Sequence, residues 1–412
     1  MKLNLLKLEC KQWSKILKKD IFSNDLWNLL KNNAVEDTKR ANSNEFAEED
    51  RAISIFDPIN DKYILFLSKE TYKIEQKLIG KLPKNRIKLT DKQKINEINN
   101  ILCNLDLKKL TYQKLLELLR QKSSNRVTYL FGLTNIMLDI NQDFKINDDF
   151  CIGSFAYSHS TSYFSDFILQ NDFAKKKNSY LLVTVTGPDD METVRKAEKK
   201  ANTLVNVLNS LCCNQAEPIK IMTQADEKAS MSAFFYFKKV QHWSESNTLR
   251  PGKLLNYTVV NKDDLDIVKT IYINRTKYNK FNKLIFSMNW LGNSIKETDY
   301  GSAFLEVVIG LECIAEKQSK GLVSPSINYQ ISNFVAMILG ENIEDKKLLI
   351  TKMKKIYEKR SQIVHDGQSN VTYEDYVEVF NLVRNLITKL IYDVNFKNIS
   401  DLNAWVDDKL LS

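Results

Sequence analysis

The stretch that decides the fold class is YLLVTVTGPDDMETVRKAEKKANTLVNVLNSL, residues 180–211. Its opening run, Tyr180–Thr186, is rich in β-branched and other apolar residues, which predicts a strand. Gly187 and Pro188 end that run, and the two aspartates after them are candidate caps for a helix. An apolar stripe then recurs at helical spacing through Val194, Ala197, Ala201, Leu204, Leu208 and Leu211. A strand followed by a long amphipathic helix predicts a sheet covered on one face.

Further strand signals lie on both sides of this stretch. They are found at Val127–Phe131, Ile219–Thr223, Ala233–Lys238 and Leu254–Val260. This part of the chain contains no GxGxxG, no P-loop and no GxSxG, so it offers no phosphate-binding loop and no nucleophile elbow.

The N-terminal part of the chain combines helical periodicity with one hairpin. Residues 2–33 and 91–121 have apolar residues at helical spacing. Between them, Ala52–Phe56 and Tyr63–Leu67 are two β-rich runs that flank a Pro/Asn/Asp turn. We therefore expect a mixed helical domain with a β-hairpin over residues 1–126.

Strand signals weaken after residue 262, and helices take over. We expect them at 263–292, 300–318, 326–340, 345–366 and 372–395, with a short tail helix from Ser400. The predicted fold class is α+β, with three domains: residues 1–126, an α+β domain over 127–261, and a helical bundle over 262–412.

Composition excludes several classes of protein. The 412 residues are 43% hydrophobic and 27% charged, which is globular, and the net charge of +9 permits an anionic partner without requiring one. The six cysteines include no CxxC and the three histidines show no metal-ligand spacing. No stretch approaches 18 uninterrupted apolar residues. We expect a cytoplasmic protein with reduced thiols, no metal, no cofactor and no membrane partner.

The segment that carries chemistry is IYEKRSQIVHDG, residues 356–367. Arg360 lies four residues from both Ile356 and Val364, so it falls on the apolar stripe of its predicted helix, where a guanidinium requires an anionic partner or an interface. His365 follows five residues later, which places it about 140° around an ideal helix from Arg360. The two side chains converge only where the helix ends near His365 or where a second chain completes the site.

This segment, in its helical context, resembles the HEPN superfamily and in particular its Apea-like branch, found in bacterial anti-phage proteins. The similarity rests on the arginine, the small polar Ser361 and the histidine before a glycine, and on an upstream helix that carries Glu306 and Glu312. It covers about residues 265–395. The resemblance implies a helical HEPN bundle at the C-terminus.

The resemblance also implies an activity, metal-independent cleavage of RNA by its ribose 2′-OH. His365 and Arg360 are the expected catalytic residues: a histidine exchanges protons near neutral pH, and an arginine holds the charge of a phosphorane. A homodimer that brings two motifs together is expected, because one histidine per chain cannot easily serve as both base and acid. The expected biological role is a defence or toxin effector of a bacterium, whose residues 1–261 bind a phage-derived or cellular trigger.

Other residues have expected supporting roles. Three of them lie within the segment itself: Tyr357, Ser361 and Asp366. The other two, Glu306 and Glu312, belong to the upstream helix. The basic run before Arg360 offers three RNA-binding candidates: Lys352, Lys355 and Lys359.

Each of these roles has a structural alternative. His365 can be a helix-terminal histidine favoured by the helix dipole, and Arg360 can be an ion-pair partner of Glu306 or Glu312. Tyr357 can be a core aromatic, Asp366 a turn residue, and the lysines a solvated face. The alternative functions are a non-catalytic HEPN module that dimerises and binds nucleotide, RNA or protein, and an antitoxin-like regulator.

Overall fold

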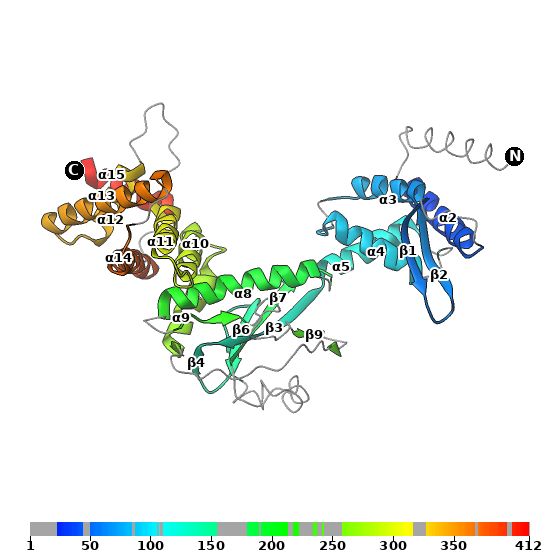
Figure 1. Ribbon diagram of the computed structural model, residues 1–412, viewed down its shortest axis with the longest axis horizontal. Coiled ribbons are helices and arrows are strands. Elements are labelled where there is room, and N and C mark those ends of the chain that lie inside the picture. Colours follow the sequence, from blue (N-terminus) through cyan, green and yellow to red (C-terminus); the bar gives the residue numbers. More distant parts are fainter. Residues whose placement is uncertain are drawn as a thin grey trace. The chain divides into compact units, whose positions relative to one another are not determined.

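The computed structural model describes most of the chain in two compact units (Figure 1). The first comprises residues 1–127 with 186–193, and the second residues 128–185 with 194–412. The described residues are 23–43, 50–84, 87–104, 107, 110–154, 179–188, 191–212, 217–221, 234–236, 241–242, 258–315, 327–366, 370–393 and 398–411.

The described part of the first unit packs four helices with one hairpin. Its elements are α2 (Ser23–Asn42), β1 (Arg51–Asp57), β2 (Lys62–Ser68), α3 (Lys69–Lys81), α4 (Asp91–Asn104) and α5 (Tyr112–Ser124). One apolar core joins them, in which Trp27, Leu67, Ile74 and Leu115 are wholly buried. The indole Nε1 of Trp27 donates to the carbonyl of Leu110 at 3.1 Å, so the ring is buried without an unpaired donor.

The predicted hairpin is confirmed as the antiparallel pair β1–β2. Its turn is held by Asp57, whose carboxylate accepts hydrogen bonds from the Ile59 N–H at 3.0 Å and from the Asn60 side chain at 2.6 Å. Asp61 adopts the left-handed conformation (φ 48°), which aspartate tolerates in turns. Of the helix expected over residues 2–33, residues 23–33 belong to α2, and residues 2–22 lie outside the described residues.

The second unit begins with a sheet and its covering helix. The main sheet has the strand order β10-β9-β3-β7-β6-β5, β8 pairs with β3, and β11 pairs in parallel with β4. The strands are β3 (Arg126–Thr134), β4 (Ile136–Asp139), β5 (Phe144–Lys145), β6 (Phe150–Ser154), β7 (Ser179–Thr186), β8 (Lys220–Ile221), β9 (Phe234–Tyr236), β10 (Gln241–His242) and β11 (Thr258–Asn261). The strands that the sequence predicts in this part of the chain are thus confirmed within the described residues, while 222–223, 233, 237–238 and 254–257 of the predicted strands lie outside them.

The long helix expected after Thr186 is α8 (Met191–Cys212), which lies along one side of the sheet (Figure 1). Its predicted apolar stripe is buried from Val194 to Leu208 and half-buried at Leu211. The proposed cap residues at 189 and 190 lie outside the described residues.

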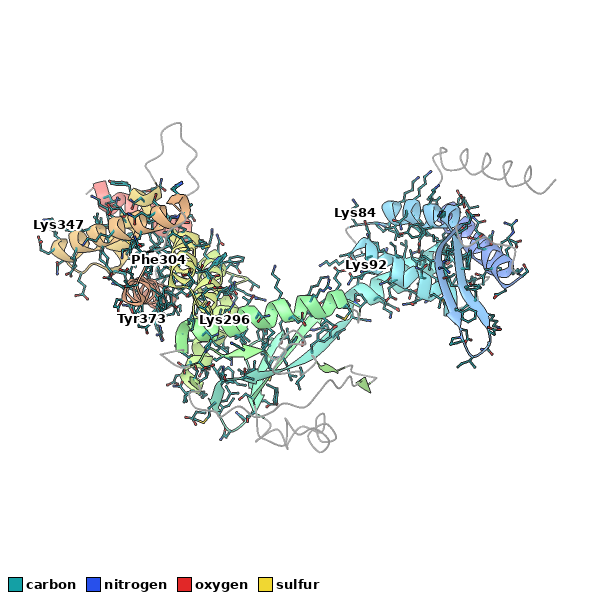
Figure 2. The ribbon with its side chains drawn as sticks, viewed as in Figure 1. Lys84, Lys92, Lys296, Phe304, Lys347 and Tyr373 are labelled. Atoms are coloured by element: carbon teal, nitrogen blue, oxygen red, sulfur yellow. The ribbon has the colours of Figure 1, made fainter. Side chains whose placement is uncertain are left out.

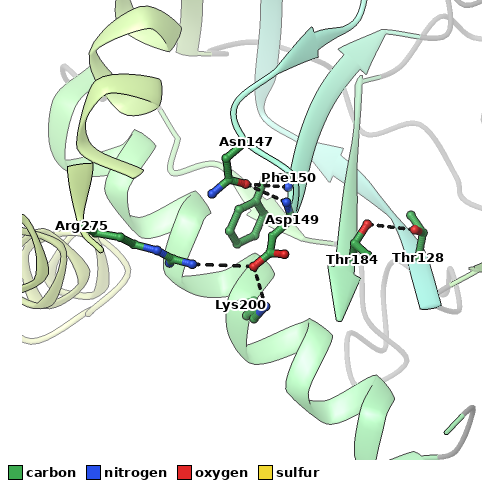
Figure 3. Close-up of polar contacts among 7 residues, drawn as sticks. All are labelled: Thr128, Asn147, Asp149, Phe150, Thr184, Lys200 and Arg275. Atoms are coloured by element: carbon green, nitrogen blue, oxygen red, sulfur yellow. Dashed lines mark hydrogen bonds and ion pairs between the residues drawn. The ribbon is translucent and has the colours of Figure 1, made fainter. Parts of the chain in front are cut away.

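Asp149, at the start of β6, joins the sheet to two helices (Figure 3). Its carboxylate accepts a hydrogen bond from Lys200 of α8 at 3.0 Å and lies 3.7 Å from the guanidinium of Arg275, the residue that caps α9 (Lys262–Asn274). Beside it, the Phe150 ring packs edge-on against Tyr272 at a centroid distance of 5.2 Å. The sheet and the first C-terminal helix therefore share both a charged and an aromatic contact.

The C-terminal part of the second unit is helical. After α9 come α10 (Asn279–Ser294), α11 (Tyr300–Ala315), α12 (Ile327–Leu339), α13 (Ile343–Asp366), α14 (Tyr373–Tyr392) and α15 (Ile399–Leu411). Their shared core includes the wholly buried Met288, Leu311, Phe334 and Val383, together with Phe304 of α11 (Figure 2).

The expectation of one helix over 263–292 is wrong, because the chain breaks it into α9 and α10 around residues 275–278. Tyr272 and Phe281 are both buried, yet nine residues of continuous helix would turn their side chains to opposite faces. The polar residues between them form the turn that brings both rings inward.

The structure is α+β, as the sequence predicts. Among the described residues, no helix combines the length and the apolar character that crossing a membrane would require.

Candidate active site

Helix α13 carries the predicted motif, and its own packing is one-sided. Asn342 caps its first turn by accepting the Asp345 N–H at 2.9 Å. Met353 and Ile356 are buried, whereas Leu349, Ile350 and Tyr357 are only half-buried. The helix therefore rests on a narrow seam, and much of its circumference faces solvent, as Lys347 does in Figure 2.

Arg360 and Tyr357 share one carboxylate on the neighbouring helix α11. The Nε of Arg360 lies 3.7 Å from Oε1 of Glu312, and the Tyr357 hydroxyl donates to the same oxygen at 3.3 Å. The Arg360 side chain keeps 34% of its surface exposed. We call these three residues the α13 cluster. It explains how a guanidinium lies on an otherwise apolar seam.

The electrostatics of the α13 cluster keep the phenol protonated. Burial raises the pKa of Tyr357 far above its ordinary value, and the charge of Glu312 raises this pKa further, against a smaller lowering by Arg360. The Tyr357 hydroxyl is therefore a fixed donor to Glu312. With the carboxylate held from one side, the guanidinium has a defined anchor and an exposed edge.

His365 is exposed and lies outside this cluster. Helix α13 continues through Asp366, so Arg360 and His365 leave it in directions about 140° apart. Within one chain the two expected catalytic groups do not converge. The sequence analysis expected the helix to end near His365 and so bring the two side chains together, but α13 does not end before His365. Gly367 lies outside the described residues.

The last turns of α13 differ from the predicted apolar stripe. Val364, expected to face inward, is 50% exposed, so that expectation is wrong. Ser361 is exposed as well, and the side chain of Asp366 lies outside the described residues. Ser361, Val364 and His365 thus form an exposed face, here called the α13 end face, that no described part of the chain covers.

Two of the three candidate RNA-binding lysines hold α13 to α14. Lys352 pairs with Glu378 at 2.9 Å, and Lys359 pairs with Asp375. The ammonium group of Lys359 is the first cause that lowers the pKa of Asp375. Lys355, by contrast, is exposed and makes no ion pair with any described residue. Lys355 is therefore the candidate whose charge faces solvent.

Glu306 is not part of the α13 cluster. Six residues separate it from Glu312, which places it on another face of α11. There burial, then the charge of Glu297, raises its pKa to about 7, while Lys296 opposes the shift. The sequence allowed Arg360 to pair with either glutamate, and the structure selects Glu312.

A polar junction between α8 and α10 escaped the sequence reasoning. Asn206 donates to Asn289 at 2.9 Å and to Asn293 at 2.7 Å, and its Oδ1 accepts from Lys296 at 2.6 Å. Burial lowers the pKa of Lys296. Gly292 permits this approach, since a Cβ there would lie 2.2 Å from the Asn206 carbonyl oxygen. Asparagines four residues apart in an apolar helix were the available signal.

No group of three or more histidine, cysteine or acidic residues able to hold a metal occurs within the described ranges. Searches of family models, of curated proteins and of solved structures give no match to this chain.

Proposed function

We propose that the chain is a metal-independent endoribonuclease whose active site forms from the α13 helices of two copies. The observation that carries the proposal is the α13 cluster, in which Glu312 and Tyr357 fix a partly exposed Arg360 on the same helix as an exposed His365. The HEPN resemblance of this segment supports the same reading.

The chemistry follows from these two side chains. His365 of one copy accepts the proton of a ribose 2′-OH as that oxygen bonds to the adjacent phosphorus. The P–O5′ bond breaks, and the O5′ atom takes a proton from the imidazolium of the second copy. Arg360 holds the charge that develops on the non-bridging oxygens. The products are a 2′,3′-cyclic phosphate and a 5′-OH.

A second copy is required because one chain leaves the two groups apart. The α13 end face has an exposed valine, Val364, one helical turn from Arg360 and adjacent to His365. Association through Val364 buries that side chain and brings two copies of the motif together. The same surface then serves as dimer contact and as active site.

RNA cleavage in EDTA tests the catalytic step. Purified full-length protein is incubated with total RNA, and fragment ends are analysed for the cyclic phosphate. We expect H365A and R360A each to lower the rate of RNA cleavage by about 100-fold or more, which is the typical contribution of general acid–base catalysis. The matched control is L348A, which removes an exposed side chain from the same helix. Equal cleavage by all four proteins, or a strict magnesium requirement, contradicts the proposal.

Dimerisation through the α13 end face has its own test. V364E introduces a charge at an exposed position, so the fold tolerates it, but it should abolish both the dimer and the cleavage. L348E, a charge at another exposed apolar position on α13, is the control. Analytical ultracentrifugation measures the dimer. Full activity of V364E as a monomer contradicts the two-copy site.

A second candidate function is a non-catalytic module that dimerises and binds RNA or nucleotide. It is favoured by the charge partners already present, since Glu312 faces Arg360 while Glu378 and Asp375 occupy Lys352 and Lys359. Under this reading, R360A weakens RNA binding and no variant changes RNA cleavage.

The proposed cellular role is that of a bacterial defence or toxin effector in the cytoplasm, with residues 1–261 binding the phage-derived or cellular trigger. This role rests on the HEPN resemblance. Expression of the wild-type chain alone should arrest growth, and expression of H365A should not. Growth that is equal in both cultures would instead fit an antitoxin-like regulator.

A further inference from the structure

Helix α3 of the first unit carries a lysine at every fourth position: Lys69, Lys73, Lys77 and Lys81. Each step of four residues turns an α-helix by about 40° beyond one full turn, so the four lysines lie within about 120° of its circumference. Glu75 lies opposite the middle of this arc, in the core. Three of the lysines are exposed and Lys77 is half-buried. The solvent face of α3 therefore presents lysine along its whole length.

The segment between α3 and α4 continues this pattern. Its apolar residues Leu82 and Ile87 are buried, whereas Lys84 and Lys88 are exposed. Lys92, in the first turn of α4, is exposed as well (Figure 2). We call the seven lysines of α3 and of this segment the lysine row: Lys69, Lys73, Lys77, Lys81, Lys84, Lys88 and Lys92.

Most of the lysine row keeps its charge unpaired. Five of its members make no ion pair with any described residue: Lys69, Lys73, Lys84, Lys88 and Lys92. Residues 69–92 contain three acids. Asp91 is bonded to Lys94 at 2.8 Å, and Glu75 holds its proton at neutral pH because burial raises its pKa to about 8. Of the three, Glu70 alone is left to offset the row, so this surface is strongly positive.

The composition of the lysine row disfavours two kinds of anionic partner. A helix that lies on a membrane inserts an apolar face, but the apolar residues of α3, such as Ile74 and Leu78, are already buried in the core of the first unit. A protein interface is depleted in lysine and has an apolar or aromatic centre. The exposed face of α3 offers charge without such a centre.

The backbone of a nucleic acid has the properties that this surface selects. It carries one negative charge per nucleotide along a line, and its affinity for proteins comes largely from lysine and arginine contacts that release counterions. Binding of this kind needs no apolar contact. Successive lysines of α3 rise by about 6 Å along the helix, and their long, flexible side chains can each meet a different phosphate.

We propose that the lysine row binds the phosphate backbone of a nucleic-acid strand, by charge and without contacts to the bases. The row lies in the first unit and shares no residue with the proposed nuclease site on α13. Binding to the row is therefore independent of whether α13 forms that site.

The salt dependence of binding tests the proposal. Fluorescence anisotropy measures the affinity of full-length protein for a labelled single-stranded RNA of about 20 nucleotides, longer than most single-strand binding sites. Every protein also carries R360A and H365A, so that the proposed nuclease site neither cuts the RNA nor contributes its arginine.

Each phosphate contact contributes about 0.7 to the slope of log affinity against log salt concentration. K69Q/K73Q should therefore lower the magnitude of that slope by about 1.4, which corresponds to about 25-fold weaker binding at about 0.1 M salt. K84Q/K88Q should have the same effect.

The matched control is K114Q/K122Q, which changes the net charge of the first unit by the same amount. Both lysines are exposed on α5, and each already has a carboxylate partner, Glu117 at 2.9 Å and Glu97 at 3.6 Å. This variant should keep the slope of the parent protein. Circular dichroism checks that all variants are folded, as expected for substitutions of exposed side chains.

Two further ligands separate the possible partners. DNA of the same sequence should bind with an affinity within about fivefold of the RNA, because backbone contacts carry no sequence information. Vesicles of phosphatidylcholine and phosphatidylserine should bind no more weakly to K69Q/K73Q than to the parent.

Several outcomes overturn the proposal. Folded K69Q/K73Q and K84Q/K88Q that keep the parent's slope do so, as does a control that loses as much as they do. Binding to the RNA but not to the DNA would show contacts beyond the backbone. Vesicle binding that K69Q/K73Q abolishes, with RNA binding unchanged, would make the partner a membrane.

Discussion

Replacement of Glu75 by glutamine should remove most of the pH dependence of the first unit's stability. Glu75 lies on α3 with no exposed surface, and neither of its carboxylate oxygens has a hydrogen-bond partner among the described residues. Burial raises the pKa of this carboxyl group from 4.5 to about 8. An unpaired charge at this position would be strongly unfavourable, so the folded state holds the proton.

The sign and size of the effect follow from that pKa. Because the folded pKa lies above the unfolded one, the stabilisation is complete below pH 4.5 and is lost as the pH rises through about 8. At about 1.4 kcal/mol per pKa unit, the full effect is about 4 to 5 kcal/mol, of which about 3 kcal/mol is lost between pH 5 and pH 8. E75Q carries no ionisable group there and should keep nearly constant stability.

The assay must report on the first unit by itself. Urea unfolding read by hydrogen-exchange mass spectrometry of α3 peptides does so, at pH 5 and at pH 8. The control is E36Q, which removes an exposed carboxylate from α2 of the same unit. Wild-type protein that is equally stable at both pH values, or E75Q that loses as much as wild type, would refute the reasoning.

Three further predictions concern the second unit. G292A should lower its stability by about 2 kcal/mol or more in thermal unfolding, because the new Cβ meets Asn206 backbone at 2.2 Å, whereas G80A in the first unit, with open space around it, should be neutral or stabilising. E312Q should lower the pKa of Tyr357, read by alkaline ultraviolet titration against Y357F; an unchanged titration would separate Glu312 from the phenol. H365A should change the melting temperature by less than about 2 °C, since the residue is exposed, and a larger loss would make His365 structural.

Local patterns predicted most of the secondary structure. The hairpin around Asp57–Asp61 and the apolar stripe of α8 follow from turn residues and from helical spacing, which depend on near neighbours in the chain. The break at 275–278 was missed, because it depends on which face the rings of Tyr272 and Phe281 must reach once other helices surround them.

The sequence predicted which residues belong to the candidate site, but it did not predict which residues they contact. The position of Arg360 on an apolar seam could be read from the spacing, and so could its need for a carboxylate. The choice of Glu312 over Glu306 could not, since it depends on the rotation of α11 against α13. Val364 continues the apolar spacing of α13 but lies beyond the part of the helix that its described neighbours cover.

By itself, the sequence determined the hairpin and its turn, the order of β7 followed by α8, and the angle of about 140° between Arg360 and His365 around their helix, because each depends on residues close together in the chain. The tertiary structure alone decided that Glu75 is buried without a partner among the described residues, that Thr38 and Asn42 of α2 bond to the backbone of β2, and that Arg360 pairs with Glu312. These are relations between distant segments. Their energies depend on which surfaces exclude water, and that is settled only when the helices pack.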